Sequence, residues 1–343
     1  MPIQHINADI ALQARARQDS LTKPRGSLGK LEDIACWFAT RQAKIIPDTL
    51  KPHISIFAAD HGVTIEGISA FPSAVTGEMV KNFASGGASI NVLAKQAHAS
   101  LHIIDVGVRV DTSSIDGVQQ CKTTIGTANI LHQQAMTQEA CQKAMNAGKH
   151  EAMQAIQQHK NVLIAGDMGI GNTTASAALI CLFTHEKPKH IVGKGTGIDD
   201  KTYVHKIQIV QDIINRVTHQ NTSPADYLTE VGGFEIAAMA GFYLAAAEQG
   251  VPMIIDGFIS AAAALVAQNI KPEVTQWMLA SHLSEESGHQ QALDHLKLQP
   301  LLNFNMRLGE GSGAALVVPL LQSAIALHRD MATFVSADIS SKT

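Results

Sequence analysis

The chain has 343 residues, of which 26 are Lys or Arg and 30 are Asp or Glu, so its formal net charge is −4 with neutral histidines. A weakly acidic chain gives no support for nucleic-acid binding, which favours clustered positive charge. Hydrophobic residues make up 45% of the chain and charged residues only 16%. This composition suits a large core of helices packed on a sheet, and it predicts that copies of the chain associate.

Cysteine usage and apolar runs bear on the compartment. The chain contains four widely separated cysteines: Cys36, Cys121, Cys141 and Cys181. They include no C-x-x-C pair, so neither a zinc site nor a disulfide framework is predicted. The first 20 residues lack the apolar core of a signal peptide. The apolar run 254–267 is shorter than the roughly 18 residues of a membrane helix and contains Asp256 and Gly257. We expect a cytoplasmic protein without a membrane anchor.

Short β-branched apolar runs alternate with helix-period segments, which is the pattern of a parallel sheet with crossover helices. The predicted strands are residues 53–59, 101–108, 161–165, 190–192, 251–255 and 276–280. The predicted helices are residues 75–96, 138–158, 173–183, 201–217, 235–249, 259–268 and 314–327. The expected fold class is therefore α/β, a Rossmann-like parallel sheet flanked by helices.

The two ends of the chain read as helices outside this sheet. Residues 1–45 and 314–343 are predicted to form a smaller helical domain together. Residues 46–313 are then the large α/β domain, which would bind nucleotide and base. The pairing of the two ends depends only on their shared helical pattern.

Polar or glycine residues follow almost every predicted strand. These strand ends are Asp60-His61-Gly62, Asp105, Gly166-Asp167, Gly193, Asp256-Gly257 and Ser281-His282. Ligands of open α/β sheets bind beyond the carboxyl ends of the strands. A single aspartate at such a position is commonly a helix cap, whereas several together predict a shared ligand cleft.

Two glycine-rich segments have the chemistry of a phosphate site. Residues 166–174 (GDMGIGNTT) follow a strand and open a helix, so backbone N–H groups, two hydroxyls and the helix dipole favour a phosphate there. Residues 193–197 repeat the arrangement and add Lys194. Neither segment is a Walker A motif, and the first lacks the third glycine of the dinucleotide fingerprint. Together they favour a small phosphorylated ligand over ATP or NAD.

Other polar residues are weaker signals. Lys206, in the helix after the second glycine loop, is by itself typical of a solvated surface lysine. His282 and His289 are seven positions apart with Glu285 and Glu286 between them, which is not the i, i+4 histidine spacing of a zincin helix. A mechanism without a metal is therefore expected.

Residues 308–313 are the most informative stretch, because they place Glu310 among three glycines directly before the apolar run 314–327. Glycines let backbone approach a ligand closely, and a helix start offers unpaired N–H groups. A carboxylate held there is a candidate general base. The alternative is a glycine-rich turn with a capping acid.

Taken in order, the motifs resemble the nicotinate-nucleotide:dimethylbenzimidazole phosphoribosyltransferase family over about residues 20–325. The motifs that carry this resemblance are residues 22–32, 59–63, 69–76, 166–174, 230–235, 256–258 and 307–311. The resemblance implies transfer of phosphoribose from nicotinate mononucleotide to 5,6-dimethylbenzimidazole. The products would be nicotinate and α-ribazole 5′-phosphate, the nucleotide of the cobalamin lower ligand, formed with inversion at the anomeric carbon. It also implies a homodimer that uses no cofactor.

The resemblance assigns roles to individual residues. Glu310 would be the general base. The phosphate and ribose would be surrounded by Asp167, Gly169, Asn172, Thr173, Gly195 and Lys206. The residues near the ribose and nicotinate would be Asp256 and Ser284. The flat slot for the benzimidazole would be bordered by Phe71, Pro72, Ser73 and Leu308.

Two departures from the family and two other functions stay open at this point. Asp167 stands where the family also has Glu, and Ser73-Ala74 stands where many members carry Gln-Glu, so adenine or another benzimidazole remains an alternative acceptor. The glycine loop after a strand also permits an NAD-linked oxidoreductase. A non-catalytic nucleotide-binding protein would use the same cleft, although the presence of Glu310 argues against it.

Overall fold

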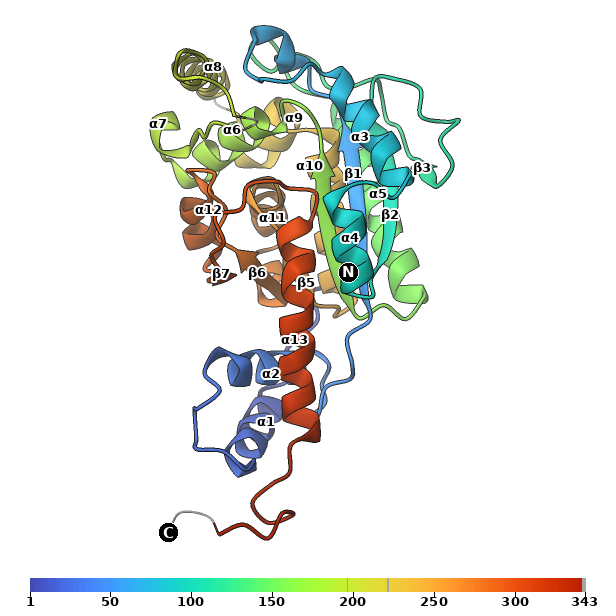
Figure 1. Ribbon diagram of the computed structural model, residues 1–343. Coiled ribbons are helices and arrows are strands. Elements are labelled where there is room, and N and C mark those ends of the chain that lie inside the picture. The colour runs from blue at the N-terminus through green and yellow to red at the C-terminus, as the bar shows by residue number, and fades with distance from the viewer. Residues whose placement is uncertain (196, 221, 341–343) are drawn as a thin grey trace.

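A computed structural model of the protein describes residues 1–195, 197–220 and 222–340. Its centre is a sheet of seven parallel strands in the order β3-β2-β1-β4-β5-β6-β7 (Figure 1). The order reverses between β1 and β4, which is the switch point at which doubly wound sheets bind ligands. The predicted α/β fold class is confirmed.

The strands are β1 (Pro52–Ala59), β2 (Ser100–Gly107), β3 (Val118–Gln120), β4 (Val162–Met168), β5 (Met253–Ile255), β6 (Met278–His282) and β7 (Pro300–Leu302). The short edge strands β3 and β7 were not predicted. The predicted strand at residues 190–192 is wrong, because this segment contains the end of helix α7 (Pro188–Ile191). Pro188 occupies the first turn of that helix, where its fixed φ favours a helical start.

Most of the long helices agree with the predicted pattern, but one predicted helix is divided in two, and the helices at residues 227–231 and 289–296 were not predicted. They are α1 (Ala8–Ser20), α2 (Lys30–Arg41), α3 (Ala74–Ala84), α4 (Ser89–Gln96), α5 (Gln138–Gln157), α6 (Asn172–Thr184), α8 (Asp200–His219), α10 (Phe234–Glu248), α11 (Phe258–Ile270), α12 (His289–Leu296) and α13 (Ser312–Asp330), with the short α9 (Tyr227–Val231). The single helix predicted at 75–96 is wrong. The chain breaks it into α3 and α4 at Gly86, which has φ 79°, a conformation that favours glycine.

The sheet is covered on both faces, and side chains alternate between them. On β1, Ile54 and Ile56 belong to the core shared with α2, α3, α4 and α13. Phe57 points to the other face, whose core is formed with α5, α6, α10 and α11. His53 and Ser55 share the face of Phe57 but are polar and completely buried. Among the described residues, no helix combines the length and apolar character that a membrane span requires.

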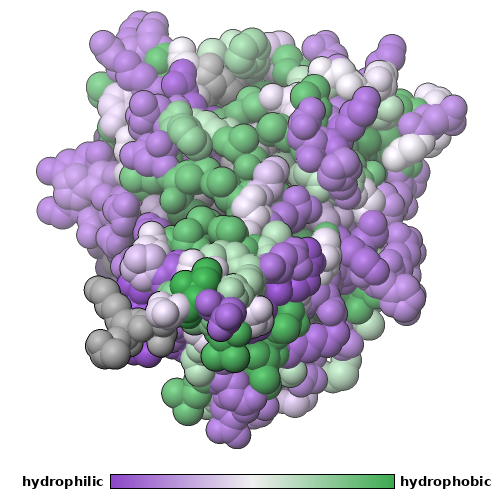
Figure 2. All heavy atoms as spheres, turned by 60° about the horizontal axis from the view of Figure 1, so that its bottom comes forward, coloured by the Kyte–Doolittle hydropathy of each residue, from purple (hydrophilic) through white to green (hydrophobic). Residues whose placement is uncertain are grey.

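The two ends of the chain meet away from the sheet. In Figure 1, α1 and α2 lie beside the lower part of α13. Arg17 Nε donates to the His328 carbonyl at 2.9 Å, and Leu21 forms an isolated bridge with Thr333. Figure 2 brings this end of the molecule forward and shows hydrophobic surface next to hydrophilic surface. The first residues pack elsewhere, since Trp277 Nε1 donates to the Gln4 carbonyl at 3.2 Å. The predicted domain boundaries remain a prediction.

Candidate active site

A cavity of about 470 Å³ lies at the carboxyl ends of β4, β5 and β6. Most of the residues predicted for the site line it: Phe71, Asp167, Gly169, Asn172, Thr173, Gly195, Ser284, Leu308 and Glu310. They come from distant parts of the sequence, so the fold assembles the site. Pro72 and Ser73 follow Phe71 but are not among the lining residues, and their place beside a base remains a prediction.

The Glu310 loop has an unusual backbone. Gly309, Glu310 and Gly311 have φ values of 83°, 61° and 76°, so three successive residues adopt the left-handed region. For a non-glycine residue this conformation costs about 1–3 kcal/mol, and such strain is concentrated at functional sites. Gly166 of β4 permits the close approach of this loop, because a Cβ there would come within 2.6 Å of the Glu310 carbonyl oxygen. The strand and the loop together fix the position of Glu310.

Asp256 supports the loop from beneath the cavity. Its Oδ2 accepts from the Gly311 N–H at 3.1 Å and its Oδ1 from the Ala314 N–H at 2.9 Å, so it caps the start of α13. Burial, and after it the charge of Asp256, raise the pKa of Glu310 to about 7. Glu310 Oε2 is buried and has no hydrogen-bond partner among the described residues. Glu310 therefore has the pKa of a general base that works near neutral pH.

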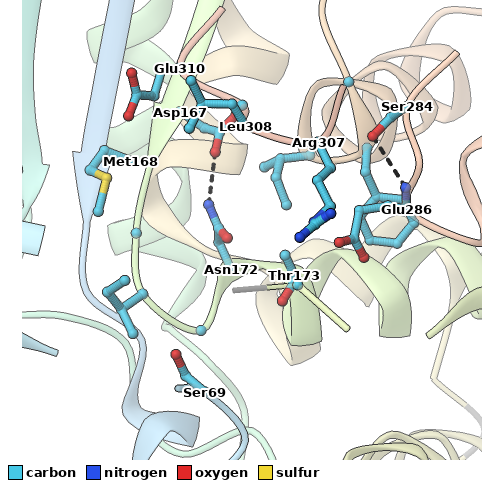
Figure 3. Close-up of a pocket in the computed structure, with 18 of the residues that line it drawn as sticks. Ser69, Asp167, Met168, Asn172, Thr173, Ser284, Glu286, Arg307, Leu308 and Glu310 are labelled. Atoms are coloured by element: carbon cyan, nitrogen blue, oxygen red, sulfur yellow. Dashed lines mark hydrogen bonds between the residues drawn. The ribbon is translucent and has the colours of Figure 1, made fainter. Parts of the chain in front are cut away.

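Asp167 adds a third acid at the end of β4. Its Oδ2 accepts from Asn172 Nδ2 at 2.9 Å, and Figure 3 shows it beside Glu310. Burial raises the pKa of Asp167 well above its usual value, and the charge of Asp256 adds to the shift. Like charges that crowd in this way favour either a shared proton or a positively charged ligand. The floor of the cavity is thus suited to a cation.

Lys206 is buried, so the surface interpretation of this lysine is wrong. Only 1% of the residue is exposed. It occupies the inner face of α8, and its Nζ donates to Thr173 Oγ1 at 2.8 Å and to the Gly193 carbonyl at 3.3 Å. Burial lowers the pKa of Lys206 to about 8. The lysine joins the two glycine-rich loops, although Thr196 of the second loop lies outside the described residues.

Sequence reasoning missed the role of Arg307 and Glu286, which also line the cavity. In Figure 3 the Arg307 side chain extends toward Thr173 and the Glu286 carboxylate. Arg307 and Glu310 belong to the same motif, residues 307–311. The positive charge of Arg307 within that motif was the signal that could have identified it as a site residue. Glu286 Oε2 is buried without a hydrogen-bond partner among the described residues, and its carboxylate lies against Gly193. Both groups therefore lie at the end of the cavity that contains Thr173.

Some strand-end acids do not reach the cavity. Asp60 Oδ2 accepts from the Arg109 N–H at 2.8 Å, and Asp105 Oδ1 accepts from the Val108 N–H at the same distance. Both therefore hold the loop after β2. His61 instead supports the cavity from below, because a Cβ on Gly169 would lie 3.3 Å from its Nε2. Gly193 follows a helix, so its place in the predicted set of strand ends is wrong.

A doubly wound sheet with acids and glycine loops around a cavity near its switch point defines an α/β enzyme that acts on a small molecule. A family model described as phosphoribosyltransferase matches residues 3–339. A nicotinate-nucleotide–dimethylbenzimidazole phosphoribosyltransferase of Chromobacterium violaceum is 54% identical over 330 residues, covering 96% of each chain. The chain therefore belongs to the nicotinate-nucleotide–dimethylbenzimidazole phosphoribosyltransferase family, and it is an enzyme of the glycosyltransferase type.

Other comparisons agree with this family. The enzyme of the same name from Xanthomonas oryzae pv. oryzae is 46% identical over 335 residues, 97% of this chain and 96% of the relative. A crystal structure of the family's enzyme from Thermus thermophilus superimposes with a TM-score of 0.93 at 40% identity, covering 98% of this chain and all of the other. The NAD-linked oxidoreductase and the non-catalytic binding protein are set aside on this evidence.

Proposed function

We propose that this chain transfers the phosphoribosyl group of nicotinate mononucleotide to 5,6-dimethylbenzimidazole, with Glu310 as the general base. The observation that carries the proposal is the Glu310 carboxylate in the cavity. Its buried Oε2 has no hydrogen-bond partner among the described residues, and its pKa is raised to about 7. A base with a pKa near the working pH is efficient, because it is ionised and still binds a proton well. The products are nicotinate and α-ribazole 5′-phosphate, and the place of the reaction is cobalamin lower-ligand synthesis.

The transfer requires one general base, and negatively charged groups near the ribose favour it. The pyridinium of the donor is a cationic leaving group, so bond cleavage neutralises it. One nitrogen of the benzimidazole attacks the anomeric carbon while the other loses its proton, since a trapped positive charge in an apolar slot is costly. Glu310 takes that proton, and the ionised form of Asp167, which lines the cavity, stabilises the positive charge that develops on the ribose. Attack opposite the leaving group converts the β-nucleotide into an α-nucleotide.

The phosphate is assigned to the end of the cavity where cations and a helix start meet. Lys206 Nζ is 2.8 Å from Thr173 Oγ1, and Thr173 lies in the first turn of α6. A helix N-terminus attracts an anion, and a buried lysine beside it adds a full charge. Arg307 reaches toward the same threonine (Figure 3). A phosphate here would also favour the protonated form of Lys206.

The aromatic base is assigned to the apolar rim of the cavity. Phe71 and Leu308 line it and are 52% and 55% exposed, which is high for such large apolar side chains. Ile68 is buried and lines the same cavity. A flat aromatic ring would cover this surface, and its second nitrogen would face Glu310. Adenine and other benzimidazoles are the alternative acceptors that the rim would also accommodate.

The assay is direct. The purified chain is mixed with nicotinate mononucleotide and 5,6-dimethylbenzimidazole in EDTA, and both products are followed by mass spectrometry. Formation of nicotinate together with α-ribazole 5′-phosphate supports the donor, the acceptor and a transfer that needs no chelatable metal. If no benzimidazole and no adenine yields a nucleotide product, the assigned reaction is wrong even though the family membership stands.

We further propose that the enzyme is a cytoplasmic homodimer. Several large hydrophobic side chains on the chain ends are exposed, including Leu12 at 74%, Val335 at 92% and Ile339 at 50%. These ends form the part of the surface that Figure 2 brings forward. Exposed apolar side chains that lie together are typical of a subunit interface, so we assign the interface to the chain ends. Light scattering after size-exclusion chromatography measures the mass directly, and a mass of one chain at micromolar concentration would contradict the proposal.

A further inference from the structure

A second cluster of ionisable side chains lies at the amino ends of β1 and β2, away from the cavity. The strand register pairs His53 with Ser100 and Ser55 with His102. Because residues alternate along a strand, these four side chains share the face of the sheet that α5 covers. Glu151 of α5 faces them and is only 2% exposed. The fold therefore brings two imidazoles and one carboxylate together on an otherwise apolar face.

The three groups converge on one point. Glu151 Oε1 lies 2.8 Å from His53 Nε2 and 2.8 Å from His102 Nδ1, and the two imidazole rings are 4.6 Å apart in an edge-to-face arrangement. One ligand atom from each residue lies within 4.8 Å of the other two. A tetrahedral ion with bonds of about 2.0–2.1 Å needs ligand atoms only a few ångströms apart, so small movements would suffice.

The hydrogen bonds of this cluster are distributed unevenly over the two carboxylate oxygens of Glu151. Oε1 of Glu151 also accepts from Ser55 Oγ at 3.0 Å, which gives it three contacts. Oε2 is buried and has no hydrogen-bond partner among the described residues. Buried polar atoms normally have a partner, so an unpaired carboxylate oxygen beside two imidazoles favours a cation as a ligand of this cluster.

We propose that His53 Nε2, His102 Nδ1 and the Glu151 carboxylate bind a divalent transition-metal ion of the zinc type, with a solvent molecule as the fourth ligand. Two histidines and one glutamate with an open position are an established ligand set for Zn²⁺. The remaining nitrogen of His53, Nδ1, lies 2.8 Å from Ser100 Oγ, which provides the outer-shell partner that metal-bound histidines usually have. The His102 side chain is 28% exposed, so an ion can reach the site from solvent.

The three ligands come from three different elements, because His53 lies on β1, His102 on β2 and Glu151 on α5. The site ties together β1, β2 and α5 and lies away from Glu310, so its role is to stabilise the fold and not to take part in the transfer.

The test is a titration of the full-length enzyme, first stripped with EDTA and then freed of the chelator, with Zn²⁺ by calorimetry, repeated with Co²⁺ by visible absorption. We expect one ion per chain in the wild type and a tetrahedral Co²⁺ spectrum. His102→Ala and Glu151→Gln should each weaken binding by more than about 100-fold, because loss of an outer-shell partner alone weakens metal sites 10–100-fold. Ser100→Ala should fall in that smaller range. Zn²⁺ should raise the Tm of the wild type and not that of His102→Ala.

His150 is the matched control, because it is exposed and precedes Glu151 on the same helix. His150→Ala should bind Zn²⁺ as the wild type does. Equal binding by the wild type, His102→Ala and Glu151→Gln overturns the proposal, as does a loss in His150→Ala that matches the loss in His102→Ala. If Glu151→Gln does not fold, His102→Ala and Ser100→Ala decide the question, since both remove partly exposed side chains.

Discussion

Glu310 and Glu151 are both buried at an end of the same sheet, yet their carboxyl groups behave in opposite ways. Burial raises the pKa of Glu310 to about 7, and the neighbouring Asp256 adds to the effect. The pKa of Glu151 falls to about 2 although it is also buried, because His102 and His53 donate hydrogen bonds to it. Burial alone therefore does not set the protonation of a carboxylate. The donors and charges that the fold places beside it decide the direction.

The two glutamates also differ in their backbone conformation. Glu310 lies in a left-handed loop between two glycines, whereas Glu151 lies within the regular helix α5. Backbone strain and a carboxyl group with a raised pKa occur together at the carboxyl edge, where we place the reaction. At the amino edge, the carboxylate of Glu151 lies in a regular helix and contacts two histidines, so it joins α5 to β1 and β2. The two edges of one sheet thus separate chemistry from stability.

Removal of the base at the carboxyl edge should have the largest effect on turnover. Glu310→Gln keeps the size of the side chain but cannot accept the proton, so kcat should fall about 10² to 10⁴-fold, the usual range for a general base. The Kd for nicotinate mononucleotide should change little. Steady-state kinetics and calorimetry measure the two values. A Glu310→Gln variant that keeps full turnover would show that the base lies elsewhere.

A buried lysine at the same edge should act on binding. Lys206→Met removes the charge beside Thr173 while it preserves most of the volume, and hydrogen bonds to charged groups contribute about 1.5–3 kcal/mol. The Kd for nicotinate mononucleotide should rise about 10- to 100-fold, with a smaller effect on kcat. Lys194→Met is the control, because Lys194 lies next to Gly193 in the second glycine-rich loop, but its side chain is exposed and paired with Asp200. Equal effects of the two variants would contradict the assigned phosphate site.

The raised pKa of Glu310 predicts the pH dependence of the reaction. The carboxylate is the active form, so kcat/KM should rise with pH up to about 7, and it should fall again above about 8, where Lys206 of the free enzyme loses its charge. Below that value the rate should fall about tenfold for each pH unit. Lys206→Met should keep this acidic limb and Glu310→Gln should lose it. An acidic limb that is unchanged in Glu310→Gln belongs to another group.

A substitution at the amino edge should change the free energy of unfolding and leave turnover unchanged. Glu151→Gln removes a charged hydrogen-bond acceptor for two histidines, so the free energy of unfolding at pH 7 should fall by about 1–3 kcal/mol. The lowered pKa of Glu151 gives the wild type stability that is present above the ordinary value of 4.5 and is lost as the pH falls toward 2. The difference between wild type and variant should therefore shrink in that window. Urea unfolding in EDTA measures it, and a difference that does not depend on pH would contradict it.

Local pattern was sufficient for much of the fold and for part of the site. Short apolar runs between the helical segments were sufficient to predict β1, β2, β4, β5 and β6, because buried parallel strands are continuously hydrophobic. The edge strands β3 and β7 are three residues long and carry too few side chains for a pattern. Glycines around Glu310 and after β4 identified two of the loops that line the cavity, because close backbone approach needs glycine.

The parallel α/β arrangement, the glycine loops and the candidate base Glu310 could be predicted from the sequence, since these depend on local spacing and on the order of motifs. The environments of single charged groups, in contrast, depend on how the chain folds. The fold buries Lys206 against Thr173, turns Asp60 and Asp105 toward the loop after β2, and brings Glu151 to two histidines about 50 and 100 positions away. Burial and charge depend on residues that are distant in the chain, and no local pattern encodes those contacts.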